Sequence, residues 1–179
     1  VGLLAGSLTG SLNNPGASDS TGALLHEAAL KGQTEIADLL ISKGANVNAR
    51  DRSGATPLHQ AALKGNLAFA AMLLKHGAEV DARDNGGVTP VAVAALSGFR
   101  DLVVLLLDHG AGREARDEES GATPLYQAAA WGRTAVVELL IDRGADVNAR
   151  SKAGVTPLQA ALANGFTDAA KVLREHGAK

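Results

Sequence analysis

Apolar residues in this chain recur in pairs of short stretches that are separated by turns. In one such pair, the first stretch follows a Thr-Pro step at Thr56 and stops at Gly65, and the second runs from Leu67 to Gly77. Apolar positions three and four residues apart predict helices, and a glycine after each stretch supplies the left-handed residue that ends a helix. We therefore predict two short helices here, followed by an extended segment at residues 78–83.

The same pattern occurs five times along the chain. The threonines of the Thr-Pro steps lie 33, 34 and 33 residues apart, and the units are 18–50, 51–83, 84–116, 117–150 and 151–179. Helices this short fall below the ~12–15 residues that an isolated helix needs for marginal stability, so they must stack on their neighbours. The period and the stacking predict an all-α repeat solenoid.

The segment before the first unit has a different composition. Residues 1–17 are mainly glycine, serine, leucine and alanine, carry no charge and do not begin with methionine. A flexible tail, a short cap packed on the first unit, and the remnant of an export signal are three interpretations. An export signal requires basic residues before its apolar stretch, and none is present. We expect a flexible tail or an N-terminal cap extension, and this segment assigns no compartment.

Charge and composition exclude several classes of function. The chain has 17 basic and 19 acidic residues, for a net charge of −2, so no bulk positive field favours nucleic acid as a partner. No cysteine is available for disulfides or thiolate chemistry, and the longest apolar run, residues 102–107, is too short to cross a bilayer. We expect a soluble monomer, in the cytoplasm or the periplasm, with no membrane or nucleic-acid partner.

Two stretches of the second unit carry a family resemblance. Residues 54–66, GATPLHQAALKGN, and residues 73–82, LLKHGAEVDA, resemble the ankyrin repeat, and the resemblance extends over residues 18–179. It implies paired antiparallel helices in each unit, hairpin-like loops that project from them, and a concave face formed by the loops and the first helices. It also implies binding of partner proteins, and it does not imply catalysis.

No residues suggest a catalytic or metal site. His26 and His59 occupy the position at which the family's histidine ties a loop to the helices. His76, His109 and His176 precede the closing glycines of second helices, at least one repeat apart, which is roughly 8–10 Å or more and too far to share a metal ion. We expect no cofactor. A non-catalytic protein-binding module is the first interpretation, and a regulatory or targeting domain that modulates an enzyme is the alternative.

The fourth unit holds the only tryptophan and the only tyrosine, Trp131 and Tyr126. The loop before them is one residue longer than the others. Because these two side chains are enriched at binding hot spots, we predict that Trp131 anchors a partner and that Tyr126 supports it. The longer loop would set its orientation through Arg113, Arg116, Glu118 and Glu119. In the alternative interpretation, Trp131 lies flat over neighbouring helices and Tyr126 replaces the histidine hydrogen bond.

Two further columns of residues recur at the repeat spacing. Arginine precedes four turns, at Arg50, Arg83, Arg116 and Arg150, either paired with Asp51, Asp84 and Asp117 or available to an acidic partner. An apolar strip beside this column, with one lysine, is predicted to face the concave groove; it consists of Leu30, Leu63, Lys64 and Leu96. Exposed single leucines are ordinary, so partial burial of these leucines between units remains the alternative.

The first and last units depart from the repeat pattern. In the first unit Ala23 and Leu24 replace the Thr-Pro step, which is typical of a degenerate N-terminal cap. In the last unit Arg174 occupies a column of Ile41, Leu74, Leu107 and Ile141. A charged side chain in this column costs little free energy only when no further unit packs against it. Arg174 is therefore predicted to face solvent at the end of the stack.

Overall fold

The repeat pattern folds into two parallel columns of helices. The computed structural model describes the backbone of residues 15–179 and the side chains of residues 20–179. Ten helices lie in this range, with no strand: α1 (Pro15–Lys31), α2 (Thr34–Ser42), α3 (Pro57–Lys64), α4 (Leu67–Lys75), α5 (Pro90–Ser97), α6 (Arg100–Asp108), α7 (Pro124–Ala130), α8 (Thr134–Asp142), α9 (Pro157–Ala163) and α10 (Thr167–Glu175). The expected all-α solenoid is confirmed.

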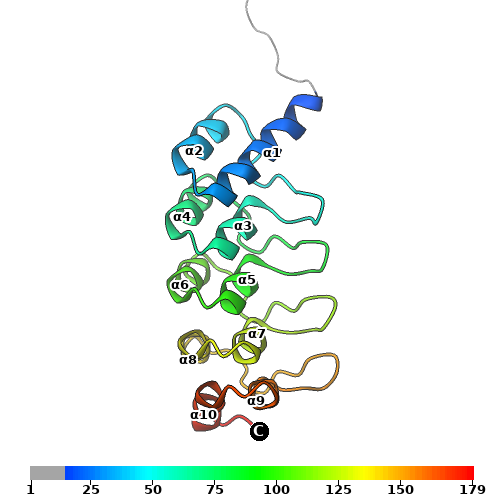
Figure 1. Ribbon diagram of the computed structural model, residues 1–179, viewed down its shortest axis with the longest axis vertical. Helices are drawn as coiled ribbons and strands as arrows, with labels where there is room; N and C mark the ends of the chain where they lie inside the picture. The colour runs from blue at the N-terminus through cyan, green and yellow to red at the C-terminus, as the bar shows by residue number, and fades with distance from the viewer. Residues whose placement is uncertain (1–14) are drawn as a thin grey trace, which may run out of the picture.

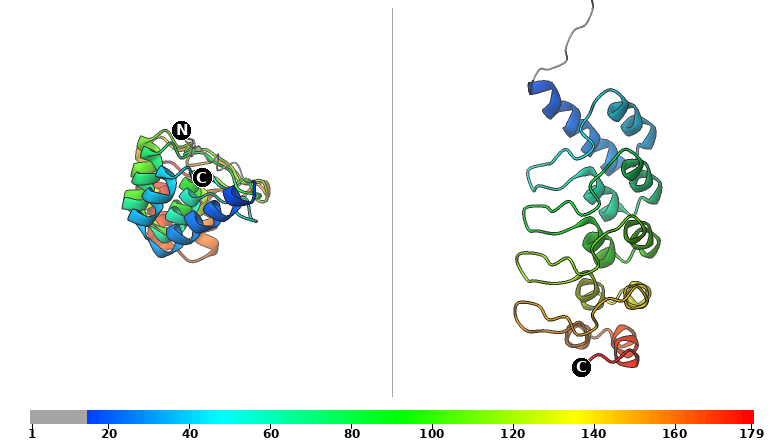
Figure 2. Two further views of the ribbon diagram at one scale, coloured as in Figure 1. Left: turned by 90° about the horizontal axis from the view of Figure 1, so that it is seen from above. Right: turned by 180° about the vertical axis from the view of Figure 1, so that it is seen from behind.

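Odd-numbered helices form an inner column and even-numbered helices an outer column (Figure 1). The inner helices pack on one another along the stack and each on its own outer helix. Four long loops join consecutive units and project to one side, as both further views show (Figure 2). These finger loops are residues 43–56, 76–89, 109–123 and 143–156, and the third is one residue longer than the others.

Local chemistry sets the helix boundaries where the sequence predicts them. Each finger loop ends in a threonine with extended backbone, followed by a proline at the first helical position, where its missing N–H costs nothing. The Thr123 and Thr156 hydroxyls accept the N–H groups of Tyr126 and Gln159 at 3.2 and 3.3 Å. Helix α3 then ends at Gly65, whose φ of 68° places it in the left-handed region.

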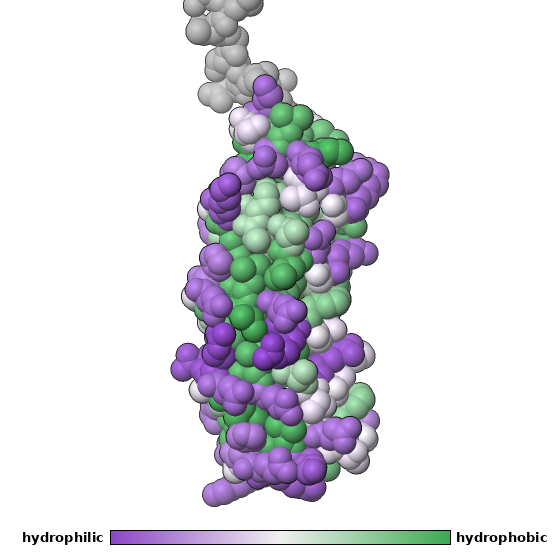
Figure 3. Space-filling view, turned by 90° about the vertical axis from the view of Figure 1, so that its left-hand side faces the viewer, coloured by the Kyte–Doolittle hydropathy of each residue, from purple (hydrophilic) through white to green (hydrophobic). Residues whose placement is uncertain are grey.

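Small side chains let the inner helices approach closely. The paired alanines of α3, α5 and α7 are fully buried; they are Ala61, Ala62, Ala94, Ala95, Ala128 and Ala129. Larger side chains such as Leu58, Phe69 and Leu73 fill the space between the two columns and are also buried. Figure 3 views the outer helices, where apolar residues run along the middle of the face and polar residues flank this strip and cross it in the lower half.

Two local expectations differ from the structure. Residues 78–83 are not extended throughout, because the Ala82 N–H donates to Glu79 O at 3.2 Å and closes a turn. The first inner helix is also longer than its counterparts: α1 begins at Pro15, three residues before the expected first unit, and contains Ala23 and Leu24. With no Thr-Pro step and no capping threonine at this point, nothing interrupts the helix.

The two ends of the stack expose residues whose counterparts are covered. Ile36 of α2 is 49% exposed, whereas Phe69 at the same position of the second unit is buried by the unit before it. Leu162 of α9 is 43% exposed in the column that elsewhere holds the buried alanines. Arg174 is exposed, as predicted, whereas its counterparts Leu74 and Leu107 are half-buried.

Candidate functional site

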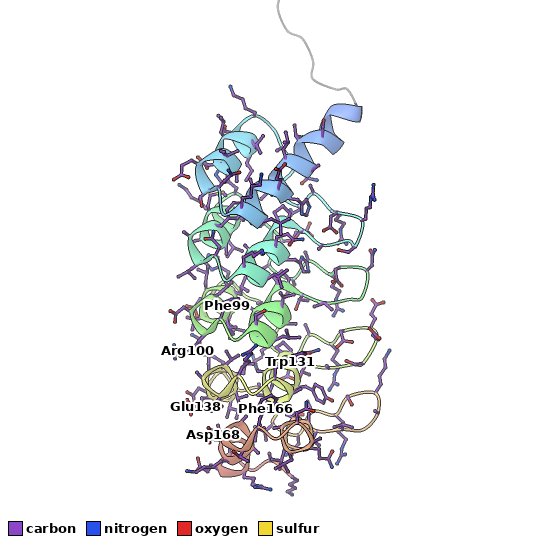
Figure 4. The ribbon with its side chains drawn as sticks, in the orientation of Figure 1. Phe99, Arg100, Trp131, Glu138, Phe166 and Asp168 are labelled. Carbon is purple, nitrogen blue, oxygen red and sulfur yellow. The ribbon has the colours of Figure 1, made fainter. Side chains whose placement is uncertain are left out.

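Trp131 is the most exposed aromatic side chain of the described residues. It is the residue that follows α7, in the short loop that joins this helix to α8, and it is 53% exposed. In Figure 4 it lies on the near side of the stack, at the level of the fourth unit. The structure therefore places this large side chain half in solvent.

Tyr126 does not take over the hydrogen bond of the histidines that it replaces. His26 Nε2 lies 2.8 Å from Ala49 O, and His59 Nε2 lies 2.9 Å from Val88 O, so both rings tie a finger loop to an inner helix as expected. Tyr126 is half-buried, and within residues 20–179 its hydroxyl has no hydrogen-bond partner. The interpretation of Tyr126 as a substitute for the histidine bond is therefore wrong.

The predicted apolar strip is open at two of its three leucines. Leu30 and Leu63 are 46% and 52% exposed, whereas Leu96 is half-buried between its neighbours. Lys64 is exposed beside Leu63 and takes part in no ion pair with the described residues. The concave face therefore offers apolar area mainly over its first two units.

The arginine column is part of the fold. Arg83 Nη1 donates to Gly87 O at 3.1 Å and to Arg116 O at 3.0 Å, so one guanidinium closes its own turn and reaches the next loop. The other arginines of the column, Arg50, Arg116 and Arg150, donate to the corresponding turn carbonyls, and the first two also reach the next unit. The column therefore holds neighbouring finger loops in register.

The expected ion pairs between these arginines and the turn aspartates do not form in the described part of the chain. Asp51 Oδ1 instead accepts the N–H groups of Ser53 and Ala55 at 2.8 and 3.0 Å. Burial raises the pKa of Asp51, but these bonds and the Ser53 hydroxyl outweigh it, and the pKa lies below its usual range. Asp84 and Asp117 cap their turns in the same way.

The loop before the fourth unit contributes acidic residues but not the side chain of Arg113. Arg113 Nε donates to Gly144 O at 3.2 Å, which directs this residue to the end of α8. Glu118 and Glu119 are exposed at the tip of the loop. The Glu118 N–H donates to Gly86 O at 2.8 Å and so connects this tip to the previous one. The residues at the tip are therefore held in place by backbone contacts.

The histidines do not form a metal site. Among the residues that the structure describes, no group of three histidine or acidic side chains could hold a metal ion. Burial lowers the pKa of His59, against the opposing effect of its bond to Val88 O, so the ring is favoured in its neutral form. His109 Nδ1 and His176 Nδ1 bind the carbonyls of Leu105 and Val172 in the last turns of their helices. His76 instead contacts Asp38 of the previous unit at 2.6 Å.

Sequence reasoning missed two hollows beside the inner helices. A cavity of about 810 Å³ lies between α1 and the first finger loop, and its walls include His26, Leu30 and Arg52. A shallower one of about 450 Å³ lies at the short loops of the second and third units, beside Phe99 and Leu67. The first depends on how the finger loop packs beside α1 and the second on contact between the second and third units, and no local sequence pattern indicates either.

Comparisons with known proteins agree with the repeat geometry. A family model described as ankyrin repeats (3 copies) matches residues 3–84 and 93–179. No curated protein matches the chain. In the described range of the chain, none of the helices has the length and hydropathy that crossing a bilayer requires.

Proposed function

Because the chain belongs to the ankyrin repeat family, we propose that it is a non-catalytic module that binds a partner protein through its concave face and finger loops. The fourth unit is the centre of this interface. Its finger loop is the longest of the four, and the two large amphipathic aromatic residues follow directly after it. Proteins of this family generally mediate interactions with other proteins.

The exposure of Trp131 is the observation that carries this proposal. A tryptophan that packed between neighbouring units would be buried, but Trp131 is 53% exposed at the end of an inner helix. Tyr126, with a hydroxyl that has no partner among residues 20–179, stands five residues before it. Truncation of a tryptophan in a desolvated interface centre typically costs ~2 kcal/mol or more of binding energy.

Polar residues around this centre orient the partner. Glu118 and Glu119 are exposed at the loop tip, and the guanidinium of Arg116 keeps further donors beyond its two carbonyl bonds. Leu63 and Lys64 extend the contact surface toward the second unit. Arg83 and Arg50 contribute positive charge along the finger loops while they hold them in register.

The test is capture of the native partner with wild-type protein and with Trp131→Ala, followed by mass spectrometry. Loss of the captured protein with an unchanged unfolding midpoint supports the proposal, because an exposed anchor contributes to binding and little to folding. Leu39→Ala is the matched control, because Leu39 is 57% exposed on the outer helix α2. Retained capture together with a lowered unfolding midpoint would contradict the proposal.

A further inference from the structure

The short loops that join the inner and outer helices form a second edge of the stack. This short-loop edge consists of residues 32–33, 65–66, 98–99, 131–133 and 164–166. At two places a phenylalanine covers a glycine of the unit before it: Phe99 lies against Gly65, and Phe166 against Gly132. A glycine has no side chain to hold the ring away, so each ring rests directly on backbone.

These rings are held in place but remain accessible. Phe99 is 37% exposed and Phe166 is half-buried, and Trp131 lies between them in the chain with 53% of its surface exposed. In Figure 4 the labels of the three residues follow one another down the stack, with Trp131 beside the inner helix α7. The edge therefore presents three aromatic side chains at successive units.

A hollow of about 450 Å³ continues this aromatic row toward the second unit. Leu67, Phe99 and Leu102 form its apolar wall, and Leu67 is 43% exposed. Arg100 and Asp101 stand at its rim, 3.7 Å apart, and neutralise each other. The hollow therefore suits one apolar side chain of a bound segment more than a charged group.

The charges change along the edge. Beyond Trp131, Glu138 of α8 and Asp168 of α10 are exposed, and neither carboxylate has an ion-pair or hydrogen-bond partner within residues 20–179. Figure 4 shows both beside the outer helices, below Trp131. Lys171, three residues after Asp168 on α10, lies 4.0 Å from Glu175, and Arg133 has its Nε 2.9 Å from Leu96 O. Within residues 20–179, the fourth and fifth units thus present two exposed carboxylates with no cation paired to them.

We propose that the short-loop edge binds a segment of the partner protein that is apolar at one end and basic at the other. This inference rests on the proposed function, because it concerns the same partner. An aromatic or branched aliphatic side chain enters the hollow beside Phe99, and lysine or arginine side chains pair with Glu138 and Asp168. The two sites lie about two repeats apart, roughly 20 Å by helix-packing distances, which a helical segment of ~13 residues spans.

The probe is a fluorescein-labelled peptide, LLAALLAQAKKAKK, which is apolar in its first half and basic in its second, and its binding to the purified protein is followed by fluorescence anisotropy. LLAALLAQAEEAEE and SSAASSAQAKKAKK are the controls for charge and for apolar content. We expect the first peptide to bind at least about tenfold more tightly than either control, which corresponds to ~1.4 kcal/mol. Equal binding of the acidic and basic peptides would overturn the proposal.

Substitutions on the protein test whether the peptide binds at the short-loop edge. Glu138→Lys with Asp168→Lys, and separately Leu67→Ser, should each weaken the first peptide about tenfold. Glu79→Lys with Asp142→Lys is the matched control, because it makes the same change in charge at exposed carboxylates away from the edge. Circular dichroism checks that each variant is folded. A control pair that weakens binding as much as the edge pair would mean that net charge alone attracts the peptide, and would reject the site.

These outcomes are separate from those of the proposed function. If Trp131→Ala leaves partner capture unchanged while peptide binding still requires Glu138 and Asp168, the concave interface fails and the edge stands. If partner capture requires Trp131 but the edge variants bind the peptide as the wild type does, the edge fails and the concave interface stands.

Discussion

The ring of Phe99 lies so close to Gly65 that a β-carbon added to this glycine would come within 2.5 Å of it. Gly65 also has a φ of 68°, a conformation that side chains with a β-carbon rarely adopt. Gly65 therefore ends its own helix and also leaves the space into which the aromatic ring of Phe99, from the next unit, packs. The same relationship links Phe166 to Gly132.

Gly65→Ala should lower the free energy of unfolding by about 2–4 kcal/mol, through left-handed strain and through the displaced ring. Gly77→Ala is the control, because Gly77 also has a positive φ but no atom lies within 4 Å of an added β-carbon. It should cost only the strain, about 1 kcal/mol. Denaturant unfolding measures the free energy of unfolding of both variants. An equal decrease in the two would show that the packing of Phe99 on Gly65 does not contribute to stability.

Arg83→Lys should destabilise the protein by about 1 kcal/mol although it keeps the charge. Arg83 Nη1 donates to both Gly87 O and Arg116 O, and the planar guanidinium fixes the directions of these two N–H groups, which an ammonium on a shorter, flexible stem does not. Arg52→Lys is the matched control, because Arg52 is exposed on the same loops and its guanidinium has no partner in residues 20–179. If urea unfolding gives both variants the wild-type midpoint, the arginine column has no structural role.

Acidification should destabilise the protein in part through His59. Burial lowers the pKa of His59 in the folded state, so the unfolded chain takes up the proton first as the pH falls below 6.5. The stability that this ring contributes is complete above 6.5 and is lost as the pH falls through its folded pKa.

His59→Gln tests this assignment, because Gln159 occupies the same position in the fifth unit and accepts the Thr156 N–H at 2.9 Å. The difference in unfolding free energy between neutral pH and about pH 5 should be smaller in the variant than in the wild type. An identical pH dependence in the two proteins would show that His59 does not contribute to it.

Arg174→Leu should promote self-association. Arg174 is exposed at the end of the stack, in a column whose other members, among them Leu74 and Leu107, are half-buried against a neighbouring unit. A leucine there joins the exposed Leu162 in an apolar end surface. Light scattering over a concentration series measures the mass, and monomeric behaviour identical to that of the wild type would reject the prediction.

Much of this protein is determined by short-range sequence chemistry. The Thr-Pro step at Thr56 and the glycine at position 65 set the ends of α3, and their recurrence sets the repeat and the solenoid. His26 and His59 could be assigned to loop contacts from their column alone. Capping and turn formation involve residues only a few positions apart, which is why a single sequence reveals them.

Contacts between units were decided only by the tertiary structure. Arg83 has an aspartate next to it in the chain, yet its guanidinium binds carbonyl oxygens, and Oδ1 of that aspartate accepts two backbone N–H groups of its own turn. Arg113 reaches Gly144 on the next unit, and Phe99 rests on Gly65 of the previous one. Each of these contacts joins residues that are 31 to 34 positions apart in the chain. The donors, acceptors and uncovered glycine backbone that make them come within reach of one another only after the units have stacked.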